Sequence, residues 1–384
     1  MIKTLQEIQS SIASGEITAI TLDTSIVDAQ QKNLEHGLLR RLSQFKGSDT
    51  KVLLPDVVLR EIESHLLNDA EETLTAVRRA NSLISRRWQH ASAGPFAEAT
   101  NNVLSVTAAS VVKSRLEAFC AASDVVTIKA EMYVKTGDVI RRYFTSKPPF
   151  DTKESKKHEF PDAFALLTLE AWAAQNNTHV LVVTQDGDWK SYCAESECLI
   201  ALDNLSIVLG CFQRETARYA CQRMLELYEE GDPLDLKAKL LDEVRNRWYD
   251  IIDININAYS QFQYTGEGLE IEFADLTIET NDKSIIVPVE YGDDHVVASL
   301  QVRASAEITC HFLFDKWDSI DCEYTPMGTG FAIRKEELCL SALVTLEGDL
   351  PNKMKVVEIE ILPESFYLEF GEIEPSWMTH PDNH

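Results

Sequence analysis

A chain of 384 residues with 45% hydrophobic side chains can bury a large core, so its length and composition predict two or three folded domains and exclude a disordered protein. Its 62 acidic residues outnumber its 36 basic ones, and a formal charge of −26 argues against binding of nucleic acid over the whole surface. The charge is uneven, since residues 1–210 hold 22 basic and 27 acidic residues, whereas residues 211–384 hold 14 and 35.

The eight cysteines are scattered, and no CxxC pair or histidine stands at the spacing of a zinc finger. This pattern is typical of reduced thiols in a cytosolic protein. The amino-terminal residues lack the long apolar core of a signal peptide, and no stretch approaches the roughly 18 apolar residues that cross a bilayer. We therefore expect a cytoplasmic protein without membrane contact.

The first apolar run, ITAITL at residues 17–22, is rich in β-branched side chains and predicts a strand. Asp23, Thr24 and Ser25 follow as candidate N-caps of a helical pattern that continues to about Phe45. Together these residues predict a strand, a turn and a helix.

A second strand, predicted at residues 52–54, leads into the helix VVLREIESHLL. On that helix Val58, Ile62 and Leu66 recur at the spacing of a buried stripe. Glu61 borders the stripe and Glu63 does not.

Residues 69–145 predict a largely helical insertion, longer than a simple crossover between strands needs. Within it two arginine pairs lie seven to eight residues apart and so share one helix face. A further basic segment covers residues 141–157. These charges are either a solvated face or a basic track for a phosphodiester backbone. The two pairs are Arg78, Arg79, Arg86 and Arg87.

Pro161 opens a third helical pattern, PDAFALLTLEAWAAQNN, and Asp162 follows where a helix dipole favours an anion. The apolar run HVLVV at residues 179–183 then predicts a strand buried on both faces, and it ends abruptly in Thr184, Asp186 and Asp188. A last short strand is predicted at residues 206–209. The alternation of strands and helices is typical of an α/β fold with a parallel sheet flanked by helices.

The remainder of the chain changes its hydrophobic period. Two amphipathic helices, interrupted at residues 231–233, predict a helical connector over residues 211–258. Beyond them apolar residues alternate with polar ones, as at 296–312 and 338–346, which indicates antiparallel strands with one buried side. We expect three parts: residues 1–210, the connector, and an acidic, antiparallel β-rich domain at residues 259–384.

Acidic residues recur at the strand ends and helix starts of the first part. A right-handed β-α-β winding brings such positions to one edge of a sheet, where ligands bind in open α/β folds. Carboxylate oxygens are the ligands that Mg²⁺ and Mn²⁺ prefer, and metal-activated water cleaves phosphodiesters. The acids expected to converge are Asp23, Glu61, Asp162 and Asp186.

Four segments in this order give residues 17–210 a resemblance to the PIN-domain nucleases. They read LDTSIV, VLREI, FPDAFAL and VVTQDGDW, and the last is the most specific. The resemblance implies that the four acids bind metal, that Asp188 is an auxiliary acid and that Thr184 orients the cluster. It also suggests that Lys157 approaches a phosphate. The longer architecture is similar to bacterial PIN proteins that carry an accessory carboxyl-terminal region.

The function expected from this resemblance is a metal-dependent endoribonuclease that uses Mg²⁺ or Mn²⁺ and forms no covalent intermediate. Two alternatives remain open: a structure-selective DNA nuclease, and an inactive PIN scaffold that binds a protein partner. Roles as a toxin, a defence effector or a processing enzyme are all compatible with the sequence. Four roles of the acidic region also remain open: it aids solubility, it contacts a protein partner, it mimics nucleic acid, or it mediates self-association.

Overall fold

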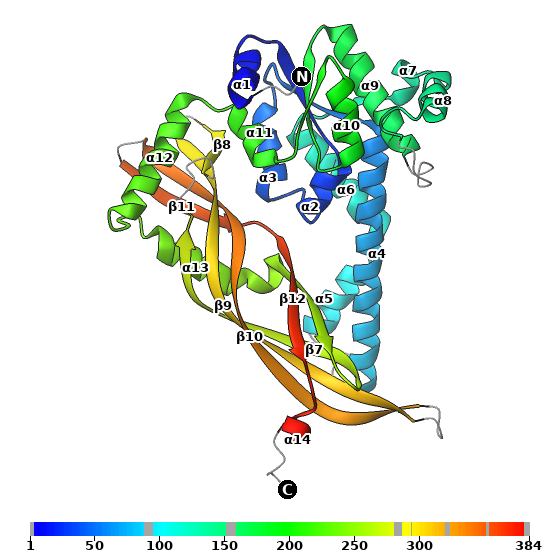
Figure 1. Cartoon of the computed structure of the whole chain (residues 1–384), viewed down its shortest axis with the longest axis vertical. Coiled ribbons are helices and arrows are strands. Elements are labelled where there is room, and N and C mark those ends of the chain that lie inside the picture. The colour runs from blue at the N-terminus through cyan, green and yellow to red at the C-terminus, as the bar shows by residue number, and fades with distance from the viewer. Residues whose placement is uncertain are drawn as a thin grey trace. The chain divides into compact units, whose positions relative to one another are not determined.

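The computed structural model describes residues 4–87, 95–150, 159–279, 286–292, 294–318, 323–350 and 353–379. The chain forms two compact units, Met1–Phe212 and Gln213–His384 (Figure 1). Among the described residues, no helix combines the length and the apolar character that crossing a bilayer requires.

The first unit is built around a sheet of five parallel strands in the order β3-β2-β1-β4-β5. Strand order reverses at β1, because the chain adds β2 and β3 on one side of it and β4 and β5 on the other. This confirms the predicted α/β class. The strands are β1 (Ile17–Leu22), β2 (Lys51–Pro55), β3 (Val126–Ile128), β4 (His179–Val183) and β5 (Leu199–Leu202).

The two central strands form because most of their side chains are apolar on both faces of the sheet. Val180, Leu181, Val182 and Val183 have no exposed surface, which is the expected environment of a central parallel strand. In register, Leu22 of β1 lies opposite Val183 of β4, so both strands end at the same level of the sheet.

Helices cover both faces of this sheet (Figure 1). The longest, α4, runs without interruption from the end of β2 to Arg87, within the region predicted as a helical insertion. The helices of the first unit are α1 (Leu5–Ala13), α2 (Thr24–Ala29), α3 (Gly37–Arg40), the 3-10 helix η1 (Arg41–Phe45), α4 (Asp56–Arg87), α5 (Pro95–Leu104), α6 (Ala108–Ala122), α7 (Ala130–Tyr133), α8 (Thr136–Thr145), α9 (Phe160–Asn176), α10 (Gly187–Glu195) and α11 (Leu205–Cys211).

Two local predictions were wrong. Residues 206–209 lie in α11 instead of a strand, because the Asn204 side chain accepts the Ile207 N–H at 3.2 Å and starts a helix there. The last strand is β5, and the stretch at residues 69–145 is largely helical as expected, although it also contains the edge strand β3. The helix expected to continue to Phe45 ends at Ala29, where Gln31 and Lys32 adopt positive φ angles.

The second unit begins with two helices, α12 (Glu215–Glu229) and α13 (Leu236–Ile251), separated at the predicted break. Its main sheet is antiparallel, with β11-β10-β9-β7 in order and β8 paired to β9, which confirms the predicted β-rich region. One pair departs from that pattern, since β6 and β12 run parallel. The remaining bounds are β6 (Ile252–Tyr259), β7 (Gln263–Ile278), β8 (Val287–Tyr291), β9 (His295–Asp318), β10 (Glu323–Asp349), β11 (Lys353–Ile361), β12 (Glu364–Glu372) and α14 (Ser376–Thr379).

The core of the second unit lies between its two helices and one face of the sheet. Ala220 and Met224 of α12 and Leu240 of α13 are fully buried against strand residues such as Val302 and Leu340. The Arg245 guanidinium also donates to the Phe273 carbonyl at 2.6 Å, which fixes α13 to β7. Both helices therefore fold as parts of this unit.

Candidate active site at the carboxyl edge of the parallel sheet

The reversal of strand order between β1 and β4 defines where a site is expected. In open α/β sheets the loops that follow two such strands diverge and leave a crevice at their carboxyl ends. Asp23 follows β1 directly, and the turn Thr184 to Asp186 follows β4. The segment with the most specific sequence signal therefore lies at the switch point of the sheet.

Asp23 continues the sheet ladder, because its backbone N–H donates to the Val183 carbonyl at 3.0 Å. Its side chain is only 3% exposed. The carboxylate accepts hydrogen bonds from the hydroxyls of Ser25 at 2.5 Å, Thr184 at 2.9 Å and Thr24 at 3.2 Å. Asp23 stands at the N-cap position of α2 but makes no capping bond with its side chain. Burial raises its pKa in spite of these three donors.

Thr184 joins the ends of β1 and β4. Its hydroxyl donates to Asp23 and accepts the Asp186 N–H at 3.0 Å. Asp186 in turn caps α10, with Oδ1 accepting the N–H groups of Asp188 at 2.7 Å and Trp189 at 3.0 Å. This turn thus fixes Asp23 through the Thr184 hydroxyl and fixes Asp186 through the first N–H groups of α10.

Asp162 lies in the first turn of α9, one residue after Pro161. Its Oδ1 accepts the indole N–H of Trp189 at 2.8 Å, and that ring is 1% exposed in the core. Burial raises the pKa of Asp162 to about 7, the indole donor opposes the shift, and the neighbouring charges of Asp23, Glu61 and Asp186 add to it. An anion here is held away from solvent and faces like charge.

Glu61 lies on α4 beside the predicted stripe, in which Val58, Ile62 and Leu66 are each 2% exposed. Its side chain is half-buried, whereas Glu63 is exposed. Burial raises the pKa of Glu61, and the charge of Asp23 contributes to the rise. Glu61 therefore faces the other acids from a separate helix.

The four acids predicted from the sequence are thus electrostatic neighbours, held by β1, α4, α9 and α10. Carboxylate oxygens fit a hard divalent cation such as Mg²⁺ or Mn²⁺, and such a cation would relieve the burial and repulsion that raise these pKa values. Over the described residues, no three acidic, histidine or cysteine side chains already converge as metal ligands. Protein donors occupy oxygens of Asp23, Asp162 and Asp186 instead.

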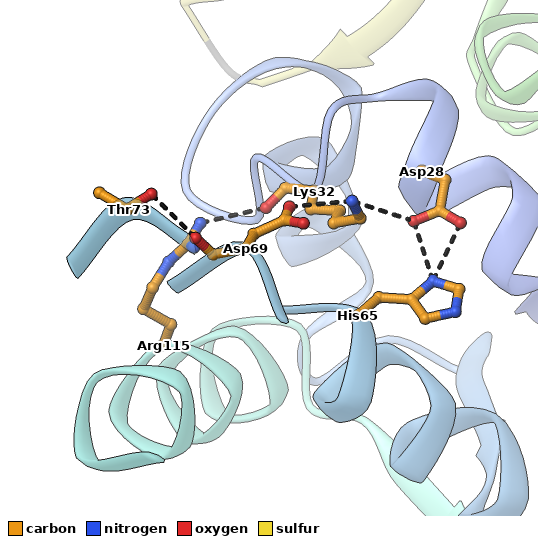
Figure 2. Close-up of polar contacts among 6 residues, drawn as sticks. All are labelled: Asp28, Lys32, His65, Asp69, Thr73 and Arg115. Carbon is orange, nitrogen blue, oxygen red and sulfur yellow. Dashed lines mark hydrogen bonds and ion pairs between the residues drawn. The ribbon is translucent and has the colours of Figure 1, made fainter. Parts of the chain in front are cut away.

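A polar network that the sequence analysis missed joins α2 and the following loop to α4 and α6 (Figure 2). The Asp28 carboxylate contacts His65 Nδ1 at 3.0 Å, one helical turn beyond Glu61, and Lys32 binds Asp69 at 2.8 Å. Arg115 donates to the Lys32 carbonyl at 3.1 Å. These contacts hold the helix of Glu61 against the segment that follows Asp23. The partners are 37 to 83 residues apart, so no local pattern reveals them.

The remaining predicted residues lie outside this cluster or outside the described side chains. Asp188 is the second residue of α10 and is half-buried. Arg78, Arg79 and Arg86 are exposed on α4. The Arg87 side chain and Lys157 fall outside the described part of the structure.

Residues 20–189 match a family model described as PIN domain. The match spans all four acids and most of the first unit, as the resemblance predicted. PIN domains have a nuclease-type fold. Their activity generally depends on a divalent metal, and their substrates are nucleic acids. Searches of curated proteins and of solved structures gave no match to this chain.

Proposed function

We propose that this protein is a metal-dependent endoribonuclease. The observation that supports the proposal is the set of four acids at the switch point of the parallel sheet, of which Asp23, Glu61 and Asp186 each lie close enough to raise the pKa of Asp162. A purely structural purpose for four mutually repelling acids is a poor explanation, because each adds an electrostatic cost to the folded state.

In this proposal Asp23, Glu61, Asp162 and Asp186 hold one or two Mg²⁺ or Mn²⁺ ions. A bound ion of this kind activates water and offsets the charge that develops on a phosphodiester. Thr184 and Ser25 keep the Asp23 carboxylate in one orientation, and Trp189 does the same for Asp162. Asp188 acts as the auxiliary acid.

RNA is the proposed substrate, and the exposed arginines of α4, with Lys157, are candidates for contacts to its backbone. The identity of the RNA that is cleaved would distinguish a toxin from a defence effector and from a processing enzyme. A DNA nuclease and a protein-binding scaffold are the alternatives against which the experiment is designed.

The test is cleavage by the purified full chain of structured and unstructured RNAs and DNAs in Mg²⁺, in Mn²⁺ and in EDTA. The variants are Asp162→Asn and Asp186→Asn, in which the amide oxygen still accepts the indole or helix N–H. The matched control is Asp203→Asn, an exposed acid that pairs only with Lys190 among the ion pairs of the described residues.

We expect RNA cleavage by the wild type and the control, and none by the two site variants, with all four proteins folded. Full activity of both site variants would remove the proposed site. Cleavage restricted to DNA would favour the DNA nuclease, and a folded protein inactive with every ion and substrate would favour the scaffold.

A further inference from the structure

Helices α7 and α8 form a small lobe beside α9, the helix that carries Asp162 in its first turn (Figure 1). The lobe, residues 129–147, follows directly on the carboxyl end of β3. Its start is fixed to α4, because the Asp56 carboxylate accepts the Ala130 N–H at 2.9 Å. Asp56 opens the same helix that carries Glu61.

Helix α8 is packed firmly against the two helices whose starts hold Asp162 and Asp186. The Tyr143 ring lies 5.2 Å from that of Phe160, two residues before Asp162, and Val139 is completely buried with Ala163. The Arg142 guanidinium lies 4.4 Å over the Tyr192 ring of α10. These contacts give the lobe a fixed position relative to the acids.

The outer surface of the lobe is apolar and basic at the same time. Phe144 is 78% exposed and Met132 is 73% exposed. The lobe has five basic and two acidic residues, a net charge of +3 in a chain of net charge −26. Arg141 pairs with Asp138 at 3.1 Å, but this pair is exposed and holds the guanidinium only weakly.

We propose that Phe144 is a stacking platform for an unpaired base of single-stranded RNA, with Arg141 and Lys147 contacting the adjacent phosphates. The proposal rests on the endoribonuclease function and names the substrate class of that site. Exposed aromatic rings among basic side chains are the features that bind single strands, because every base has a stacking face and every linkage a charge. Tyr143 contacts the Phe144 ring in an edge arrangement, with centroids 5.3 Å apart.

The experiment measures binding of a labelled, unstructured RNA of about 12 nucleotides, within the range of single-strand sites. All proteins carry Asp186→Asn so that the RNA survives. The variants are Phe144→Ala, Phe144→Trp and Arg141→Gln, and the matched control is Val111→Ala, an exposed apolar residue on α6. Thermal unfolding checks each fold.

We expect Phe144→Ala to weaken binding roughly 5- to 150-fold, the effect of one lost base stack, and Phe144→Trp to restore it. The salt dependence of RNA binding should stay unchanged in Phe144→Ala because no charge is removed. Arg141→Gln should lower the slope of log affinity against log salt concentration by about 0.7, for one phosphate contact. On a fully abasic strand of equal charge, Phe144→Ala should have no effect. Single-stranded DNA should show the same loss, since stacking does not read the sugar.

If the wild type cleaves RNA and Phe144→Ala binds it as tightly as Val111→Ala does, the platform is wrong and the nuclease proposal stands. An equal loss on the abasic strand also overturns the platform. A wild type that neither cleaves nor binds single strands overturns the proposed function, and the platform with it.

Discussion

Asp162 shows how one side chain can satisfy both a structural rule and a chemical one. An aspartate in the first turn of a helix is ordinary, because the helix dipole favours it there. Its carboxylate, however, accepts a hydrogen bond from the buried indole of Trp189, and its neighbours are three other acids. Capping therefore does not account for this residue, whose pKa of about 7 places its charge near the midpoint of titration at neutral pH.

Metal-free protein should become less stable as pH rises from about 4 to about 7. The folded state keeps the Asp162 proton across this interval, since burial raises its pKa from 3.8 to about 7, and the unfolded chain loses it. Stability falls wherever the folded state binds more protons. The variant Asp162→Asn lacks this dependence, so its free energy of unfolding relative to wild type should rise with pH, by at most about 1.4 kcal/mol per pH unit.

Urea unfolding in EDTA at about pH 4.5 and about pH 7.5 measures the difference on either side of the window. Asp203→Asn serves as the exposed control and should track the wild type. A difference between Asp162→Asn and wild type that does not change with pH would show that Asp162 is ionised throughout.

At the scale of elements, the rotation of α4 decides which of its acids reaches the site. Glu61 and Glu63 differ by about 200° around a helix of roughly 3.6 residues per turn. Glu61→Gln should abolish cleavage, because it removes a half-buried charge next to Asp23, and Glu63→Ala should be nearly silent. Initial cleavage rates of both variants give the comparison. Similar losses would mean that α4 presents a different face to the substrate.

The length of α4 sets a second prediction. At 1.5 Å per residue, Arg78 lies about 26 Å and Arg86 about 38 Å along the helix from Glu61, so only an extended strand could reach both regions. If the arginines form a track, replacing Arg78, Arg79, Arg86 and Arg87 together with Gln should flatten the salt dependence of RNA binding by roughly 0.7 to 0.9 per lost contact, without changing metal affinity.

The measurement is a titration at several salt concentrations in the Asp186→Asn protein. An unchanged slope would remove the distal half of α4 from the binding surface. Residues 129–147, which lie beside Asp162, would then carry the electrostatic part of binding.

The sequence predicted the central elements of the first unit because their side chains are apolar on both faces, as in β1 and β4. It failed at the edges. Strand β3 has only three residues, of which Val126 is 37% exposed, so its pattern is too short to separate it from the surrounding helices. Helix α11 is also a short apolar run, of seven residues, and the Asn204 side chain caps its start.

The sequence likewise indicated one part of the candidate site, the acids, and missed another part, their hydrogen-bond partners. The acids could be chosen from sequence because each follows a strand or lies at a recognisable place on a helix. Their partners could not, since the bonds of Trp189 to Asp162 and of Thr184 to Asp23 span 27 and 161 residues. Such contacts depend on the packing of the whole sheet and leave no local periodicity.

At the scale of the molecule, the two units differ most in charge. The first has 22 basic and 27 acidic residues, a net charge of −5, and the second has 14 and 35, a net charge of −21. Solubility, a protein partner, self-association and mimicry of nucleic acid are the proposals for this acidity. Mimicry of nucleic acid, unlike the other three, predicts that the second unit competes with RNA for the first.

The simplest effect is repulsion through solvent, which requires no particular placement of the units. Residues 1–212 alone should then bind RNA more tightly than the full chain at low salt, with both proteins carrying Asp186→Asn. The advantage should shrink as salt rises, because the screening length falls from about 30 Å at 0.01 M to about 8 Å at 0.15 M. Thermal unfolding of the truncated chain checks that it folds.

Residues 213–384 added as a separate chain provide the decisive comparison. No effect of this added unit on RNA binding fits repulsion between tethered units, whereas competition with RNA fits a nucleic-acid mimic. Tighter binding by the full chain would contradict both and assign RNA contacts to the second unit.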